Sequence, residues 1–443
     1  MLHIIPAAGK ATRIGGIPKF LLPIEDKKFL LDFHVRNISI KKQKLRKVVA
    51  VSKEFYETIN RFNFDIEVLI VNTNTMNINT MNTNANDETI SNKYQQKTDK
   101  QHILDNPDTY IGSIENIDSK MWIMNQTSDK IVEKEIQYIP GLFKLFDEGI
   151  VNCRDHVVRM QTDINKKVEN ALPVSYIDIQ IQDDGTIVMI NDGNGIDVVK
   201  HPEYNIWVPE LIFGHLRTST NYNKDEKKIV GGKNGFGFKL VLIWSSYGQI
   251  ETVDHIRGLK YVQEFKHNLD EICSPKISKC TKSKPFTKIT FKPDYQRLGI
   301  DGLTPDLIAL LRKRVYDISA ITDKTIKVKY NSSIIPTKNF QQYIDLYIGD
   351  KTAAPRAYEE TDMRWEYAVA LTPTNEFMQV SFVNGIYTSK GGKHVEYILN
   401  QITRKMVELI EKKKKIRVNP NSIKEQLILF VRCDIENPAF DSQ

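Results

Sequence analysis

The chain has 443 residues, of which 41% are hydrophobic and 26% charged, and its net charge is +7 at pH 7. This length predicts two or three globular domains, and the mildly basic charge permits contact with nucleic acid without establishing it. No apolar run approaches ~18 residues, so the sequence predicts no signal peptide, membrane span or other membrane association. The four cysteines are too few and too scattered for a disulfide framework, and no C-x-x-C pair suggests zinc, so a reducing, intracellular compartment is expected.

The N-terminus predicts a strand that runs into a loop of small residues carrying basic side chains. Such a loop can wrap a triphosphate, with the cations offsetting its charge. The order A-A-G followed by Arg and then P-K resembles the opening of sugar-phosphate or cytidylyl nucleotidyltransferases, with Ala11 in place of the second family glycine. This resemblance implies a possible second nucleotide site at Gly9, Arg13 and Lys19.

Two further strands are predicted at 47–51 and 66–71, with a helix-like stretch between them. The following residues 72–87 are almost entirely Asn, Thr and Met without periodicity, which is typical of a linker. We therefore predict a partial, Rossmann-like nucleotidyltransferase segment at 1–71 and an Asn/Thr-rich linker at 72–96. Transferase activity of the first segment toward CTP or UTP is an open alternative function.

A helix is predicted at 143–156, where apolar residues recur at helical spacing from Leu142 to Cys153. Glu148 and Asn152 are four residues apart and so project from one face, and Asp155 follows three residues later on the same side. A carboxylate and an amide stacked in this way can position water and ligate Mg²⁺, a hard ion that takes oxygen ligands. A solvated polar face is the alternative interpretation.

A β-hairpin is predicted from the alternating segments 176–181 and 186–190, which an Asp-Gly turn separates. The second strand runs into Asp192, which Gly193 and Gly195 follow. A carboxylate at a strand end between glycines can accept a hydrogen bond from an exocyclic amine such as that of adenine. The alternative is another tight turn.

Four glycines fall within the seven positions 231–237. A strand or helix interior would lose roughly 0.5–1 kcal/mol at each of them, so they indicate a loop that brings its backbone N–H groups close to a ligand, usually an anion. The apolar segment 238–244 predicts that a helix begins directly after this loop. A glycine-rich surface turn is the alternative.

These three pieces, in this order, resemble the GHKL ATPase fold of gyrase and the histidine kinases. Longer matches look like the eukaryotic-type and large-virus DNA topoisomerase II family. The resemblance covers about residues 97–443, and its motifs include Pro107–Ser113, Thr218–Tyr222, Gly231–Gly235, Thr388–Val395 and Glu436–Gln443.

The resemblance implies that Glu148 is the general base that orients water toward the γ-phosphate of ATP and that Asn152 ligates Mg²⁺. It also implies that Asp192 binds adenine. His156 departs from the family, whose cellular members usually carry Asn there. The residues expected to bind ATP are Asn152, Asp155, Asp192, Gly195, Ile196, Ser219, Thr220, Asn221, Lys233, Asn234, Gly235, Phe236, Gly237, Phe238, Lys239 and Gln443.

A second domain is predicted after Asp294, with a helix at 312–320, strands at 326–330 and 379–384, and a long helix at 394–415. The resemblance implies an α/β (α+β) fold, with a GHKL ATPase sandwich at 97–294 and a transducer domain of ribosomal-protein-S5-like type at 295–443. The long helix ends in a basic run whose residues are candidate contacts to DNA, although cations also favour a solvated helix C-terminus. These residues are Lys412, Lys413, Lys414 and Lys415.

In the family, the motif at Gln443 continues into Thr and a Lys that senses the γ-phosphate, and the DNA-cleavage core follows. The resemblance therefore implies an ATPase gate, truncated and with weakened turnover, that dimerises on binding Mg-ATP and closes around double-stranded DNA. It implies a location where DNA is handled, in the nucleus or in a cytoplasmic viral factory. A non-catalytic ATP-binding dimerisation module is an open alternative.

Overall fold

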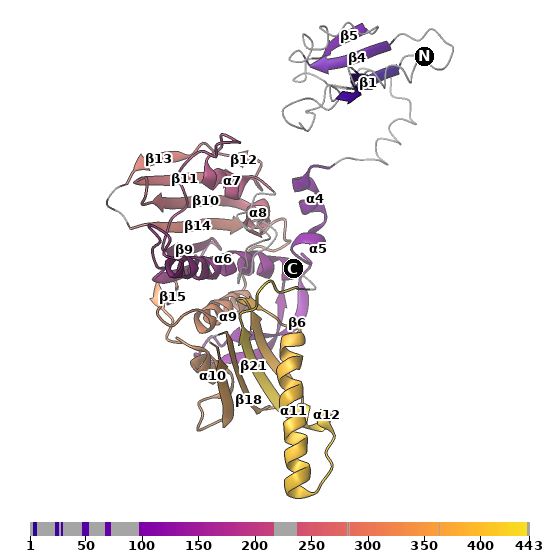
Figure 1. Cartoon of the computed structure of the whole chain (residues 1–443), viewed down its shortest axis with the longest axis vertical. Coiled ribbons are helices and arrows are strands. Elements are labelled where there is room, and N and C mark those ends of the chain that lie inside the picture. Colours follow the sequence, from indigo (N-terminus) through magenta and orange to yellow (C-terminus); the bar gives the residue numbers. More distant parts are fainter. Residues whose placement is uncertain are drawn as a thin grey trace. The chain divides into compact units, whose positions relative to one another are not determined.

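The computed structural model divides the chain into two units, Met1–Gln96 and Lys97–Gln443 (Figure 1). In the first unit it describes the backbone of five strands, and in the second it describes residues 97–216, 237–280, 282, 284–362 and 364–440.

The first unit contains a three-stranded sheet in the order β1 (His3–Pro6), β4 (Lys47–Ser52) and β5 (Glu67–Val71). Both strand pairs are parallel. A short antiparallel pair, β2 (Pro23–Glu25) with β3 (Lys28–Phe29), lies between β1 and β4 in the sequence. The three predicted strands are therefore confirmed, and their parallel order is that of an α/β unit.

The second unit is built around a nine-stranded sheet in the order β12-β11-β10-β14-β9-β8-β15-β16, with β13 also paired to β11. The predicted hairpin is confirmed, because β8 and β9 pair antiparallel with Ile181 opposite Ile187. The strands are β8 (Tyr176–Ile181), β9 (Ile187–Asp192), β10 (Ser245–Asp254), β11 (Leu259–Lys266), β12 (Glu271–Ile272), β13 (Lys276–Lys279), β14 (Phe286–Pro293), β15 (Lys327–Tyr330) and β16 (Ser333–Ile334).

Strand β15 belongs to this first sheet, whereas the sequence pattern predicted it within the second domain. It runs parallel to β8, with Val328 opposite Ile177. The pairing joins segments about 150 residues apart in the sequence, so no local sequence pattern predicts it. The chain therefore returns to the first sheet after helix α9 (Pro305–Ile321) and only then builds the second sheet.

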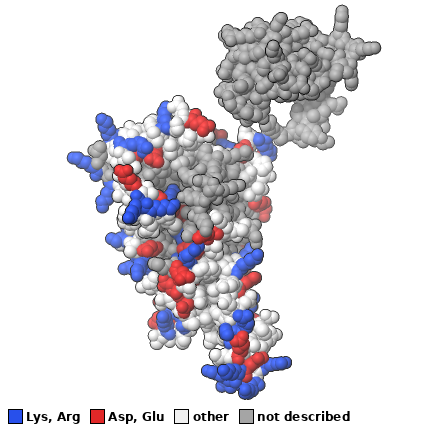
Figure 2. Space-filling model, viewed as in Figure 1, with Lys and Arg blue, Asp and Glu red and all other residues white. Residues whose placement is uncertain are grey.

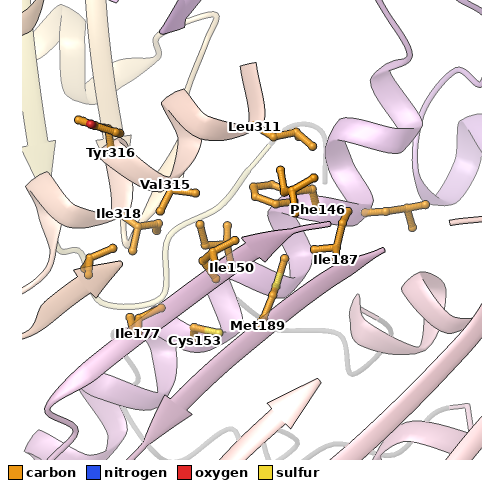
Figure 3. Close-up of a cluster of buried hydrophobic side chains, with 14 of the residues drawn as sticks. Phe146, Ile150, Cys153, Ile177, Ile187, Met189, Leu311, Val315, Tyr316 and Ile318 are labelled. Atoms are coloured by element: carbon orange, nitrogen blue, oxygen red, sulfur yellow. The ribbon is translucent and has the colours of Figure 1, made fainter. Parts of the chain in front are cut away.

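Helix α6 (Pro140–Asn165) lies between the first sheet and α9, and proline at its first position suits a helix start. Its predicted apolar face is confirmed, because Leu142, Phe146, Ile150 and Cys153 are all buried. Figure 3 shows three of these side chains beside Ile177, Ile187 and Met189 from the sheet and Leu311, Val315 and Ile318 from α9.

Several shorter elements complete the first part of the unit. The hairpin of β6 (Ile117–Met124) and β7 (Ile131–Tyr138) packs against α9. Helix α8 begins at Gly237, as predicted, and packs on α6. The short helices of this part are α4 (Asp99–Asp105), α5 (Pro107–Tyr110), α7 (Val208–Gly214) and α8 (Gly237–Ile243).

A five-stranded sheet forms the second layer, in the order β17-β18-β21-β19-β20. Strands β19 and β21 are parallel neighbours, and the long helix α11 lies in the connection between them (Figure 1). The predicted strand at 379–384 and helix at 394–415 are confirmed. The elements are α10 (Phe340–Ile348), β17 (Arg356–Thr361), β18 (Trp365–Leu371), β19 (Met378–Val383), β20 (Ile386–Tyr387), α11 (Lys393–Lys414), α12 (Pro420–Lys424) and β21 (Leu427–Cys433).

Within the described residues, no helix combines the length and the apolar character that crossing a membrane requires.

Replacing Ile150 by alanine should lower the free energy of unfolding by about 2–5 kcal/mol, because the side chain is fully buried and its removal leaves a cavity. The matched control is Ile416→Ala at a position that is 59% exposed, for which a change within about 0.5 kcal/mol is expected. Urea unfolding measures both. Equal losses for the two variants would show that α6 does not pack as described.

Candidate functional site

One side of α6 carries the three polar residues singled out in the sequence. Glu148 and Asn152 are half-buried, whereas Asp155 is buried. Within the described residues, no hydrogen bond engages the side-chain amide of Asn152. The Glu148 carboxylate forms an ion pair with Lys144, with 2.6 Å between Lys144 Nζ and Glu148 Oε1.

The Glu148 carboxylate lies directly against the start of α8. A methyl group added at Gly237 would lie 2.2 Å from Glu148 Oε2, closer than any side-chain atom can approach. Only glycine fits at this position while the carboxylate keeps its place. The structure therefore brings together two predicted site residues that are 89 positions apart in the sequence. The contact with Glu148 also explains on steric grounds why position 237 is glycine.

Lys144 was not among the predicted site residues. Burial lowers the pKa of this ammonium, but the Glu148 and Asp147 carboxylates outweigh burial and the net result is a raised pKa. Lys144 therefore stays charged and holds one oxygen of Glu148. The signal in the sequence was the spacing of four residues between Lys144 and Glu148, which places the two side chains together on a helix.

The first turn of α8 presents backbone rather than side chains. Phe238 is buried and meets Phe213 and Phe291 edge-to-face, with ring centroids 5.5 and 6.0 Å apart. Only its backbone is therefore left to meet a ligand. Lys239 is also buried, and the loss of solvation lowers its pKa to about 8. An anion bound beside this ammonium would raise the pKa again and offset part of the cost of burying the charge.

Asp192 ends β9 and its carboxylate is well anchored. One oxygen accepts hydrogen bonds from the amides of Ser175 and Tyr176, at 2.7 and 3.0 Å, and the other accepts from the hydroxyl of Ser175. A carboxylate has about four acceptor positions, so capacity remains for one further donor. An amine from a ligand can occupy it. Ser175 was not predicted, and no local pattern reveals it.

The turn after Asp192 is tied to β10. A methyl group added at Gly195 would lie 1.9 Å from the carbonyl oxygen of Val253, so only glycine allows this approach. The next amide, of Ile196, donates to Thr252 Oγ1 at 2.9 Å. Gly195 and Ile196 therefore shape the turn that presents Asp192, and the Ile196 amide is already in use.

His156 connects α6 to this same turn. A methyl group added at Gly193 would lie 3.2 Å from His156 Nε2, which has no hydrogen-bond partner among the described residues. Burial, reinforced by the charge of Arg159, lowers the pKa of His156 to about 4. The imidazole is therefore neutral at physiological pH and packs behind the turn.

The exposed basic run stands apart from this site. Lys412, Lys413 and Lys414 form the last turn of α11, and Lys415 caps it in a left-handed conformation. All four are exposed, and Figure 2 shows basic side chains gathered at the far end of this helix.

The remaining predicted site residues lie outside the described residues. For the ATP site these are Ser219, Thr220, Asn221, Lys233, Asn234, Gly235, Phe236 and Gln443, and for the possible second nucleotide site they are Gly9, Arg13 and Lys19.

Comparison with known proteins identifies a matching family model and relatives by sequence. A family model described as DNA gyrase B matches residues 339–443. DNA topoisomerase 2 of Acanthamoeba polyphaga mimivirus is 45% identical over 368 residues, which cover 81% of this chain and 28% of that protein. DNA topoisomerase 2 of Saccharomyces cerevisiae is 41% identical over 372 residues, which cover 80% of this chain and 25% of that protein.

Comparison with solved structures gives matches to the same family. The ATPase region of Saccharomyces cerevisiae topoisomerase II is 41% identical with a TM-score of 0.73, and the match covers 80% of this chain and 89% of that one. The ATPase and transducer domains of DNA topoisomerase II from Balamuthia mandrillaris are 37% identical with a TM-score of 0.72, covering 80% and 87%.

The fold is thus that of an ATPase domain joined to a transducer domain. The chain belongs to the DNA topoisomerase II family, and its similarity is to the ATPase region of that family. It spans about a quarter of the length of the two sequence relatives named above.

His156 predicts a pH dependence of stability. Its folded pKa is about 4 and its ordinary value is 6.5, so the unfolded chain binds the proton more readily. The associated stability is complete above pH 6.5 and is lost as the pH falls toward 4, by about 3 kcal/mol in all. His156→Asn should remove this loss, so its unfolding free energy should fall less between pH 6.5 and 4.5. Parallel pH profiles for the variant and the original chain would contradict the assignment.

Proposed function

We propose that residues 97–443 bind and hydrolyse ATP. The observation that carries this proposal is the Glu148 carboxylate lying against Gly237, at the end of the glycine-rich segment. A γ-phosphate bound beside Gly237 would lie next to the Glu148 carboxylate. Hydrolysis needs a water molecule directed in line at this phosphate, and a carboxylate at hydrogen-bond distance can orient it and take its proton.

Asp192 is proposed to recognise the adenine base. Its carboxylate is held in place by Ser175 and Tyr176, and it keeps acceptor capacity for the exocyclic amine. Because Gly195 and Ile196 are fixed to β10, the turn presents this acceptor in a defined direction. A preorganised acceptor of this kind favours adenine over a base that offers a carbonyl at the same position.

The side chains on α6 fit a magnesium ion. Mg²⁺ takes oxygen ligands, and in phosphoryl transfer it binds one or two protein oxygens together with the substrate phosphates and waters. Asn152 would hold it through its amide oxygen, which no described residue engages, one turn from Glu148. When bound, the ion would neutralise charge that develops on the phosphates. Lys144 meanwhile holds one oxygen of the Glu148 carboxylate in place.

Glu148→Gln should abolish most ATP turnover, by at least about 10²-fold, because the amide cannot accept a proton from water. Binding of ATP should stay within about threefold, since the amide keeps the shape of the carboxylate. Turnover is measured by phosphate release and binding by calorimetry. Asp163→Asn, on the same helix, is the matched control.

Three results separate the alternatives. Turnover that survives in Glu148→Gln would exclude Glu148 as the base. Binding without turnover in both chains would indicate a non-catalytic ATP clamp. Absence of binding in the unsubstituted chain would overturn the proposed function.

Double-stranded DNA is the proposed partner, handled within the cell by an ATP-dependent homodimer. The relatives are DNA topoisomerases, and the exposed lysines at the end of α11 offer a compact basic surface. Lysines in this arrangement bind phosphates as point charges and release counterions. A helix end exposed only to solvent is the alternative reading of the same residues.

Replacing Lys413 and Lys414 by glutamine should weaken binding to duplex DNA and reduce the salt slope of log K by up to about 1.8, twice 0.9 per phosphate contact. The matched control removes the same charge from Lys276 and Lys279, which are exposed on the edge strand β13. Fluorescence anisotropy over a salt series measures both. Identical slopes for the two double variants would show that α11 does not contact DNA.

A further inference from the structure

The tight turn between β19 and β20 inserts between two helices of the first part of the unit. Asn384 and Gly385 form this turn, both with positive φ. The Gly385 carbonyl accepts a hydrogen bond of 2.6 Å from Arg314 Nη2 on α9. A methyl group at Gly385 would lie 2.9 Å from Cδ of Arg154 on α6. The turn is therefore held between one arginine of each helix.

Arg154 also reaches the segment that follows β21. Its Nη2 donates to Asp434 Oδ1 at 2.5 Å, and its side chain is only 4% exposed. Its other terminal nitrogen, Nη1, lies 3.9 Å from Asp155 Oδ1. Arg154 thus stands between Asp155, on the proposed nucleotide side of α6, and Asp434, at the end of the second sheet.

The turn and the segment after β21 are bound to each other as well. The Asn384 side chain accepts from the amide of Ile435 at 2.7 Å and donates to the carbonyl of Ile435 at 2.8 Å. Asp434 is held further by Arg432, at 3.4 Å, and through its backbone by Arg364. A displacement of Asp434 would therefore carry Ile435 and the turn with it.

We propose that Arg154 is a positioning residue that couples the nucleotide-binding side of α6 to residues 434–440. The inference rests on the proposed ATP function. Helical geometry supports it: Arg154 projects about 120° around α6 from Glu148, at roughly 100° per residue, so one rigid helix carries both side chains. A rotation or shift of α6 that follows from contact with ATP must move Asp434 or break a buried ion pair. Breaking such a pair is costly, because it leaves the buried guanidinium of Arg154 without its charged partner.

The experiment compares Arg154→Gln and Arg154→Lys with Arg356→Gln in the full chain. Arg356 is a suitable control because its side chain is equally buried and pairs with Asp345 within the second sheet region, away from α6. Hydrogen exchange is measured for the backbone amides of residues 434–440 other than Pro438, with and without a non-hydrolysable ATP analogue. Affinity for the analogue and the kcat and KM of ATP hydrolysis are measured in parallel.

Arg154→Gln should bind the analogue within about threefold of the original chain, yet lose the analogue-dependent change in exchange at 434–440. Its kcat should fall at least about fivefold with KM little changed, the size of a modest coupling between sites. Arg154→Lys should recover part of both effects, and Arg356→Gln should show neither. An analogue-dependent change that persists in Arg154→Gln, or an equal loss in Arg356→Gln, would overturn the proposal.

Exchange without nucleotide separates this inference from the proposed function. The Ile435 amide bonds to the Asn384 side chain, so Arg154→Gln should speed its exchange even when no analogue is present. If the original chain does not bind the analogue, the ATP function fails and the coupling fails with it. If binding and turnover are normal but Ile435 exchanges at an unchanged rate in Arg154→Gln, only the coupling is overturned.

Discussion

The buried ion pair between Arg314 and Asp147 is the interaction on which the arrangement of the second unit depends. Arg314 is fully buried, and its Nε lies 2.5 Å from Asp147 Oδ1. Burial alone would lower the pKa of this guanidinium, but Asp147 and Asp317 outweigh burial and raise it. A charge this deep is tolerated only where carboxylates and a carbonyl surround it, here including that of Gly385. Satisfying the charge therefore requires α6, α9 and the β19–β20 turn to meet at one point, which joins the two sheets.

Helix α6 contacts three different parts of the unit, because its side chains point in three directions. Phe146 and Ile150 enter the core beneath the first sheet, Glu148 faces the start of α8, and Arg154 faces the second sheet. Rotation of about 100° per residue makes this division possible on a single rigid element. A change at the proposed nucleotide side of the helix would therefore be transmitted to its other sides without any flexible connection.

Much of the candidate site followed from local patterns. The spacing of Glu148 and Asn152 and the glycines before α8 each carry their own physical signature, and the structure places Glu148 against Gly237. Lys144 also had a signal, its distance of four residues from Glu148, although it was not predicted. Ser175 had none, because its contact with Asp192 exists only once β8 and β9 have paired.

The sequence by itself determined the hairpin, the two long helices, the start of α8 and the family, because these depend on periodicity, turn residues and short motifs. Only the tertiary structure decided that β15 joins the first sheet beside β8, and that Arg154 reaches Asp434. Both join residues 150 or more positions apart, and such partners are chosen by the global packing of layers and by the need to neutralise buried charge. Neither requirement leaves a mark in the neighbouring sequence.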